Sequence, residues 1–262
     1  MNLVYSCVFF NEKYIILIEK LLSSFYNHNK NNNICYLIIT TSKFEEKIRN
    51  ICKNIGLSFD IWTRDICNSD KSIDNIYEAT YSRYAIYQYP NINNYNKILY
   101  LDTDILVINN LNPLFDLELS NLLYTLYEDS YNNRLVHCAL FDEKEFTIAK
   151  KNKDTFTTAI ILFSNNTIML DIIKNIYQSI EHHHRISNGP LPCYDQPIVN
   201  KLAYSNKIVN NKLLNNYCIN IAPTDGVNKL SEMSKYLICH FATDVGDANS
   251  KIQRMSIAET IL

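Results

Sequence analysis

The chain begins with short apolar runs that are separated by amphipathic segments. The runs are continuous rather than alternating, which is typical of strands buried on both faces of a sheet. They lie at residues 3–10, 34–40, 58–62 and 97–101. Between them, apolar residues recur every three or four positions, which predicts helices over 14–26 and 44–55 and a helical stretch that ends with 82–88. Strands that alternate with helices indicate right-handed crossovers and a parallel sheet.

The second half of the chain shows the same two periods less regularly. Strands are expected at 122–127, 158–163 and 236–241, and helices at 165–181 and 195–204. The sequence contains no internal repeat, low-complexity linker or clear domain boundary. We therefore expect one α/β domain over residues 1–262.

Composition narrows the class of protein. The 262 residues are 47% hydrophobic, enough for a sizeable core, and the net charge of −2 argues against a strongly basic nucleic-acid binder. Four glycines and six prolines disfavour collagen-like and linker-rich proteins. Eight dispersed cysteines without a C-x-x-C pair favour a reduced, cytoplasmic protein. With no signal peptide and no apolar stretch of about 18 residues, we expect a soluble chain without a transmembrane segment.

Two carboxylates, Asp102 and Asp104, directly follow the predicted strand 97–101. The carboxyl ends of strands are where open α/β sheets bind ligands. Two hard oxygen ligands there suit Mg²⁺ or Mn²⁺, which can also bridge a diphosphate. The other interpretation is a polar turn in which one Asp caps the segment 112–115. The buried strand favours the metal, because two charges at a buried sheet end would otherwise lack a partner.

Residues 100–115, YLDTDILVINNLNPLF, resemble the D-x-D block of the glycogenin-like retaining glycosyltransferases, family eight, which include bacterial lipopolysaccharide galactosyltransferases. Five other segments resemble blocks of that family and occur in its order. They are FNEKY at 10–14, TYSR at 80–83, FTTAII at 156–161, YDQP at 194–197 and CHF at 239–241. The resemblance covers roughly residues 3–254 and implies a Rossmann-like GT-A domain with a mixed sheet flanked by helices. It also implies a nucleotide-binding half over 1–107 and a sugar- and acceptor-binding half over 108–262.

The same resemblance implies a metal-dependent enzyme that moves a hexose, glucose or galactose, from a UDP-sugar to a glycan or protein acceptor with retention of configuration. It implies Asp102, Asp104 and His240 as ligands of Mn²⁺ or Mg²⁺, which acts as a Lewis acid on the departing diphosphate. Arg83 and Lys251 are expected to add positive charge at the phosphates.

The donor sugar is expected to lie against the start of the predicted helix 195–204. On the resemblance, Asp195 binds sugar hydroxyls and Gln196 lies beneath the anomeric carbon, so the expected catalytic residues are Arg83, Asp195, Gln196 and Lys251. The other residues expected at the donor are Phe10, Asn11, Tyr14, Thr103, Thr157, Thr158 and Gly246. The partners implied are the UDP-sugar and the acceptor, and a homodimer stays open.

The sequence departs from the family pattern at two places. Residues 157–159, Thr-Thr-Ala, stand where the family has Asn-Ser-Gly, and the tail H-x-x-G-x-x-K-P-W is replaced after His240. Gly246 and Lys251 supply its Gly and Lys only if the loop is longer here. The alternative is therefore a degenerate, non-catalytic UDP-sugar-binding protein of the same fold. A haloacid dehalogenase-type phosphatase is disfavoured, because Leu106 stands where its D-x-D motif requires Thr or Val.

Several candidates also have a plain structural interpretation. His240 fits a buried core histidine, Asp195 fits an N-cap, and Lys251 fits a solvated surface charge. Residues 128–129, Glu-Asp, follow a predicted strand and fit either a contact to sugar hydroxyls or a solvated turn.

The resemblance assigns no role to four further features of the sequence. The histidines at 182–184 indicate a helix end rather than a metal tract, and Trp62 indicates a core residue. The segment 131–154 is interpreted as a charged insertion. The polar stretch 244–255 is predicted to be a mobile lid over the nucleotide, with Gly246 as its hinge. The other interpretation is a permanently packed tail that Ile252 and Met255 anchor, with Lys251 in solvent.

Overall fold

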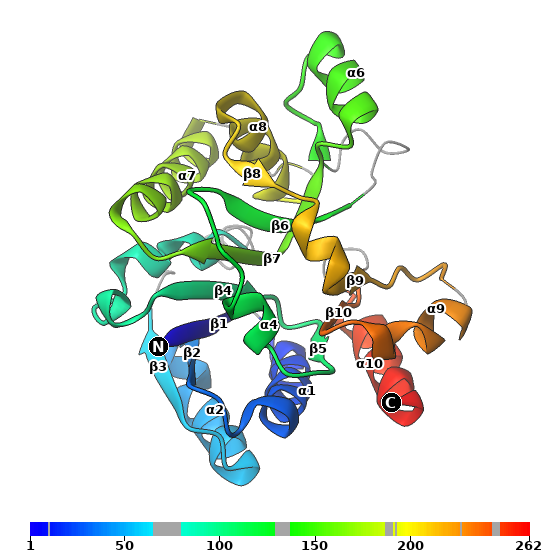
Figure 1. The fold of residues 1–262 in the computed structure, drawn as a ribbon. Coiled ribbons are helices and arrows are strands. Elements are labelled where there is room, and N and C mark those ends of the chain that lie inside the picture. Colours follow the sequence, from blue (N-terminus) through cyan, green and yellow to red (C-terminus); the bar gives the residue numbers. More distant parts are fainter. Residues whose placement is uncertain are drawn as a thin grey trace.

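The computed structural model shows an α/β fold in which helices flank a seven-stranded mixed sheet (Figure 1). It describes residues 1–9, 11–64, 80–128, 137–186, 191, 193–225, 227–242 and 247–262. The strand order is β3-β2-β1-β4-β7-β6-β8. The fold class expected from the sequence is confirmed.

The first four strands of the sheet are the apolar runs of the sequence. Their bounds are Asn2–Val8 (β1), Ile34–Thr40 (β2), Phe59–Thr63 (β3) and Lys97–Leu101 (β4). β1 pairs with β2 and β4, and β2 pairs with β3, each in parallel. Parallel pairing brings the carboxyl ends of these strands to one edge of the sheet, so Asp102 and Asp104 follow β4 at that edge.

Antiparallel strands extend the sheet beyond β4. β7 (Phe156–Ser164) pairs antiparallel with β4 and with β6 (Leu123–Tyr127), and β8 (Val209–Asn210) pairs parallel with β6. Because β7 runs opposite to β4, its first residues lie beside the end of β4. The amide of Asp102 donates to the carbonyl of Ala159 at 2.9 Å. The Thr157-Thr158-Ala159 segment therefore faces the acidic pair.

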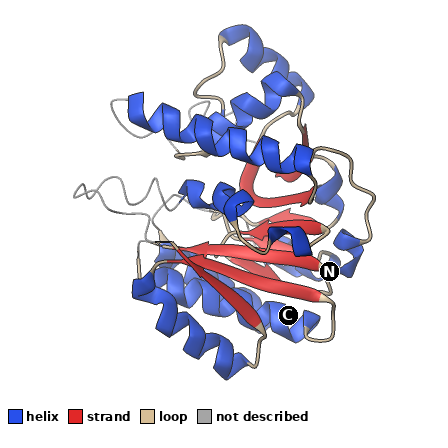
Figure 2. Ribbon diagram, turned by 90° about the vertical axis from the view of Figure 1, so that its left-hand side faces the viewer, coloured by secondary structure: helices blue, strands red, loops and turns tan. Residues whose placement is uncertain are grey.

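Helices cover both faces of the sheet (Figure 2). α1 (Lys13–Asn29) and α2 (Ser42–Ile55) bury an apolar stripe against one face. The 3₁₀ helix η1 (Ser82–Gln88), α7 (Thr167–Ile186) and α8 (Gln196–Asn206) pack on the other. The shorter helices are η2 (Ile92–Asn94), α4 (Asn112–Phe115), η3 (Leu213–Asn216), α9 (Val227–Ser231) and η4 (Met233–Lys235).

A second, three-stranded sheet has the order β5-β10-β9. Its bounds are Ile105–Val107 (β5), Cys218–Asn220 (β9) and Ile238–His240 (β10). All three strands are three residues long, and only β10 is predicted from the sequence, because it lies within the longer apolar run 236–241. His240 pairs with Ile105 on one side and with Asn220 on the other. This register carries His240 to the acidic pair.

The C-terminal segment differs from the sequence-based expectation. Residues expected to belong to a mobile lid form part of α10 (Ala248–Ile261), whose Asp247 N-cap accepts a hydrogen bond from the Ser250 amide at 3.1 Å. Ala248 and Met255 are buried, so this part is packed on the core rather than loosely held. The remainder of the predicted lid, residues 244–246, lies outside the described residues.

The charged segment 131–154 contains α6 (Glu143–Asn152). Asp142 and Glu145 form a capping box, in which each side chain accepts a hydrogen bond from the other residue's backbone amide. No helix in the described part of the chain is both long and apolar enough to cross a membrane.

Candidate active site

A pocket of about 430 Å³ lies where β1, β4 and β10 end and where β7 and α8 begin. Its lining includes most of the sequence-predicted site residues that the structure describes. They are Tyr14, Arg83, Asp102, Thr103, Asp104, Thr157, Thr158, Asp195, Gln196, His240 and Lys251. Asn11 is not among them, since its side chain accepts a hydrogen bond from the Lys13 amide at the start of α1. Phe10 and Gly246 lie outside the described residues.

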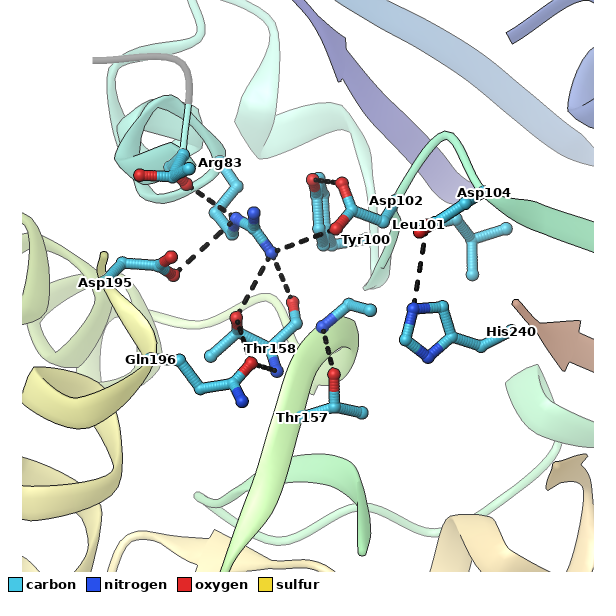
Figure 3. Close-up of polar contacts among 12 residues, drawn as sticks. Arg83, Tyr100, Leu101, Asp102, Asp104, Thr157, Thr158, Asp195, Gln196 and His240 are labelled. Atoms are coloured by element: carbon cyan, nitrogen blue, oxygen red, sulfur yellow. Dashed lines mark hydrogen bonds and ion pairs between the residues drawn. The ribbon is translucent and has the colours of Figure 1, made fainter. Parts of the chain in front are cut away.

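Arg83 is the fixed positive charge on one side of the pocket (Figure 3). It is 6% exposed, and its Nη1 atom donates to the carbonyl of Thr158 at 2.7 Å. Two carboxylates flank it, Asp102 at 3.6 Å and Asp195 at 3.8 Å. Burial opposes its charge, but Asp195 and the other acidic neighbours raise the pKa of Arg83 well above its ordinary value. The guanidinium is therefore held rigidly, as a buried ion must be.

Asp195 faces this arginine and not the backbone of its own helix. Although it occupies the N-cap position of α8, its side chain makes no capping hydrogen bond. Its Oδ2 atom accepts instead from the hydroxyl of Tyr84 at 3.2 Å. Burial outweighs the attraction of Arg83 and raises the pKa of Asp195. The purely structural N-cap interpretation is wrong, and Asp195 belongs to the polar network of the pocket.

Two left-handed residues aim the start of α8 into the pocket. Cys193 and Tyr194 have φ angles of 57° and 51°. Left-handed backbone costs a non-glycine residue roughly 1–2 kcal/mol. Strain of this kind persists where the surrounding structure fixes the chain, and here it places Asp195 and Gln196 against Arg83 and Thr158.

Asp104 forms a buried ion pair on the opposite side of the pocket. Its Oδ2 atom lies 2.6 Å from Nζ of Lys251, and its Oδ1 atom lies 3.6 Å from Nε2 of His240. Burial opposes ionisation, but the charges of Lys251 and His240 hold the pKa of Asp104 well below its ordinary value. Burial likewise opposes protonation of His240, yet Asp104 raises the pKa of that imidazole. His240 and Lys251 are thus neither an isolated core histidine nor a solvated charge.

The ring of His240 is oriented by a residue that the sequence did not single out. The Nδ1 atom lies 2.7 Å from Oδ1 of Asn220, on the neighbouring strand β9. An amide oxygen only accepts, so Nδ1 carries the proton of this bond. The Nε2 atom is left to face Asp104 and to bind either a proton or a metal ion.

The residues present fit a divalent cation at two of the three predicted ligands. The Oδ1 atom of Asp104 is buried and accepts no hydrogen bond from a described residue, and it faces Nε2 of His240. Asp102, the third predicted ligand, turns instead toward the Tyr100 hydroxyl at 2.8 Å and toward Arg83. Among the described residues, no three His, Cys, Asp or Glu side chains converge closely enough to hold an ion. Asp102 would join such a site only if it turned away from Tyr100 and Arg83.

Gln196 is held between β7 and a buried histidine. Its Oε1 atom lies 3.3 Å from both the amide and the hydroxyl of Thr158, and its amide nitrogen contacts the ring of His137. His137 is 1% exposed and lies 3.3 Å from a carboxylate oxygen of Glu128, which lines the pocket. The sequence pattern did not point to His137, because the segment 131–154 around it resembles a charged insertion. The apolar run LVHCALF was the one signal that this histidine is buried.

Trp62 and the histidines at the end of α7 lie outside the pocket lining and have structural roles. Trp62 packs on Tyr89, and Arg64 lies over its ring, so it contributes to the edge of the core as predicted. His183 and His184 lie in the last turn of α7, also as predicted.

The comparison of sequences identifies relatives of one family. The model of "Glycosyl transferase family 8" matches residues 6–244. A protein of Haemophilus influenzae named as a glycosyltransferase is 24% identical over 233 residues, which are 86% of this chain and 64% of that protein. The chain therefore spans less than two thirds of the length of this curated relative.

Solved structures with the same fold are also glycosyltransferases. The galactosyltransferase LgtC, in complex with donor and acceptor sugar analogs, aligns with a TM-score of 0.61 at 18% identity, covering 100% of this chain and 96% of LgtC. The bifunctional glycosyltransferase WbbM gives a TM-score of 0.61 at 18% identity, covering 100% of this chain and 51% of WbbM. GlyE of Streptococcus pneumoniae gives 0.59 at 19% identity, covering 99% and 61%. These similarities show a fold of the GT-A type.

Proposed function

Since the chain belongs to glycosyltransferase family 8, we propose that it transfers a hexose, glucose or galactose, from a UDP-sugar to a glycan or protein acceptor with retention of configuration. The observation that carries this proposal is the convergence of opposite charges on one pocket. Arg83 and Lys251 bring positive charge to it, and Asp102 and Asp104 bring carboxylates. A pocket of this kind suits a sugar diphosphate better than a neutral ligand.

We assign the two halves of the domain different parts of the donor. Residues 1–107, with Tyr14 at the pocket, are proposed to bind the nucleotide. Residues 108–262, with Asp195 and Gln196, are proposed to hold the sugar and the acceptor. LgtC, a structure of the same fold, has been solved with donor and acceptor sugar analogs, which supports a site for both sugars on this chain.

Asp104 and His240, together with Asp102, would hold a divalent cation, Mn²⁺ or Mg²⁺, which would supply Lewis acidity toward a diphosphate leaving group. The side chains of the pocket perform the remaining tasks. Arg83 is fixed by Thr158 and two carboxylates, so its charge needs no reorganisation as negative charge develops on the leaving oxygen. Lys251 has a flexible stem and can move from Asp104 to a phosphate oxygen.

Gln196 and Asp195 are proposed to act at the sugar. Asp195 accepts hydrogen bonds from sugar hydroxyls, and Gln196 presents its amide beneath the anomeric carbon, where it stabilises developing positive charge. The proton of the acceptor hydroxyl passes to the leaving phosphate on the same face. Transfer on that face gives an α-linked product from an α-linked donor, and a β-linked product measured by NMR coupling constants would overturn this assignment.

A non-catalytic UDP-sugar-binding protein of the same fold is the second candidate. It is favoured by the Thr157-Thr158-Ala159 segment, which replaces the expected Asn-Ser-Gly at the donor sugar. The position of Gln196 argues against it, because Thr158 binds Gln196 and Arg83 together and keeps the polar network connected.

One assay separates the two candidates. A panel of nucleotide sugars is screened by thermal shift with Mn²⁺, because a ligand at 100 times its Kd stabilises the native state by about 2.7 kcal/mol. The donor that binds is then tested for Mn²⁺-dependent hydrolysis. Asp104→Ala should abolish hydrolysis, whereas Asp171→Ala, on the exposed face of α7, should not. Binding without hydrolysis supports the non-catalytic protein, and full hydrolysis in EDTA contradicts the metal.

A further inference from the structure

A chain of polar contacts leads from Glu128 through the buried His137 to Gln196, and its two ends are partly exposed at the pocket. A carboxylate oxygen of Glu128 lies 3.3 Å from Nε2 of His137. The Nδ1 atom of the same ring contacts the side-chain nitrogen of Gln196. The Oε1 atom of Gln196 lies 3.3 Å from the amide nitrogen of Thr158. The chain thus crosses from the end of β6, past His137 and the start of α8, to β7.

The backbone amide of Thr158 is the one group of this chain that can only donate, and it sets the orientation of the Gln196 amide. The backbone amide of Thr158 only donates, so the atom of Gln196 that faces it must be the oxygen. The nitrogen of Gln196 therefore faces the ring of His137, where Nδ1 is the nearer nitrogen and Nε2 lies at 3.3 Å. It donates to the nearer one, which makes Nδ1 the acceptor. The proton on Nε2 is then donated to the carboxylate of Glu128.

The state of Glu128 agrees with this direction. Burial opposes its ionisation, but the hydrogen bond from His137, together with the electrostatic attraction of His137 and His240, lowers the pKa of Glu128. A carboxylate is the strongest partner available to an imidazole N–H, and it holds the tautomer that a neighbouring group requires. His137 is 1% exposed, so water does not compete for its nitrogens.

We propose that His137 and Glu128 are positioning residues that fix the orientation of the Gln196 amide, with its oxygen toward β7 and its nitrogen away from the sugar. This inference rests on the proposed function only for its kinetic consequence, since the hydrogen-bond direction is a property of the chain itself. Polarisation along the three groups adds negative charge to Oε1 of Gln196. That oxygen is then better suited to stabilise a positively charged anomeric carbon.

The first test measures the tautomer of His137 directly. Long-range ¹H–¹⁵N correlation spectra of the whole protein distinguish a ring protonated at Nε2 from one protonated at Nδ1. We expect the Nε2–H form, with Nδ1 unprotonated. In Gln196→Glu, a carboxylate takes the place of the amide and faces Nδ1. Because a carboxylate only accepts hydrogen bonds, Nδ1 should then carry a proton and donate it. An Nδ1–H tautomer in the unmodified protein would overturn the proposal, whether or not the protein has transferase activity.

The second test uses two amides that each imitate one ring nitrogen. In His137→Asn, the side-chain oxygen can take the place of Nδ1 and accept from Gln196. In His137→Gln, the amide reaches the place of Nε2 and Glu128 but leaves Gln196 without its acceptor. His137→Ala serves as the full removal. His28→Asn, on the exposed side of α1, serves as the control that leaves the site untouched.

The expected result is a change in kcat at nearly constant KM for the donor. His137→Ala and His137→Gln should lower kcat by about 10-fold to 100-fold, because a misplaced catalytic group loses that much. His137→Asn should recover most of the rate. Melting temperatures identify any variant that does not fold, and the Asn–Gln comparison still decides if the Ala variant is lost. Equal kcat values for Asn and Gln would contradict the proposal, whereas an inactive unmodified protein would contradict the proposed function and leave the tautomer as the deciding measurement.

Discussion

The Nζ atom of Lys251 lies 2.6 Å from Oδ2 of Asp104, and the exposed fractions of the two side chains are 11% and 4%. Asp104 is thus a predicted metal ligand that already has an internal cation. A divalent ion at Asp104 and the ammonium group of Lys251 compete for the same carboxylate. This relationship couples the predicted metal site to the predicted phosphate-binding lysine, and it can be measured without an acceptor.

Replacing Lys251 by Met should expose this coupling. The substitution keeps the length of the stem but leaves a buried carboxylate unpaired, so we expect the free energy of unfolding to fall by about 3–5 kcal/mol. Mn²⁺ should restore more stability to Lys251→Met than to the unmodified protein, because the ion replaces the lost charge. Urea unfolding with and without Mn²⁺ measures both effects. The matched control is Lys201→Met, which breaks the more exposed pair with Glu145 and should cost at most about 1 kcal/mol. Equal losses in the two variants would show that the Asp104 pair has no special role.

Asn220 should tune metal affinity without touching the metal. Its Oδ1 atom accepts from Nδ1 of His240 and keeps Nε2 pointed at Asp104. Losing such a partner typically lowers metal affinity by about 10-fold to 100-fold. We expect this loss for Mn²⁺ in Asn220→Ala by calorimetry, with recovery in Asn220→Asp. Asn206→Ala, at the exposed end of α8, is the control. An unchanged Mn²⁺ affinity in Asn220→Ala would contradict the assignment of His240 as a metal ligand.

The backbone at Cys193 offers a test of stored strain. Cys193→Gly should raise the free energy of unfolding by about 0.5–1 kcal/mol, because glycine adopts φ 57° without the steric cost. Cys193→Ala, which removes the thiol but keeps the cost, should not stabilise the protein. Cys193→Val should destabilise it, since a β-branched residue tolerates this conformation worst. Thermal unfolding ranks the three, and a Gly variant no more stable than the Ala variant would mean that the site holds no strain.

The pKa of Glu128 predicts a pH dependence of stability. The groups that act on this carboxylate are His137, His240 and Asp104. Since folding lowers its pKa below 4.5, the ionised Glu128 stabilises the fold above about pH 4.5 and loses that contribution as the pH falls through the folded pKa. The free energy of unfolding of the unmodified protein should therefore exceed that of Glu128→Gln at pH 7, and the difference should shrink below pH 4.5. A difference that is constant from pH 7 to pH 3 would contradict this ionisation.

The sequence by itself determined the parallel half of the sheet and the position of the acidic pair. The runs at 34–40 and 97–101 coincide with β2 and β4, because a continuous apolar run records burial on both faces of a strand. The sequence alone also places Asp102 and Asp104 at the end of β4, because the D-x-D motif directly follows such a run. The order of the six family blocks then indicated the residues that line the pocket.

Only the tertiary structure decided how those residues meet. The strands β5 and β9 are three residues long and carry no detectable period, yet their pairing with β10 brings Asn220 and His240 to Asp104. The apolar residues of α10 do not gather on one face of the helix, so the sequence suggested a mobile segment there. In the structure this helix is packed, and its Lys251 forms an ion pair with Asp104. Local periodicity records how deeply an element is buried, but it does not record which distant side chain completes a buried charge or hydrogen bond. That choice depends on the contacts between elements, and it determines the surroundings of Asp104 and Gln196.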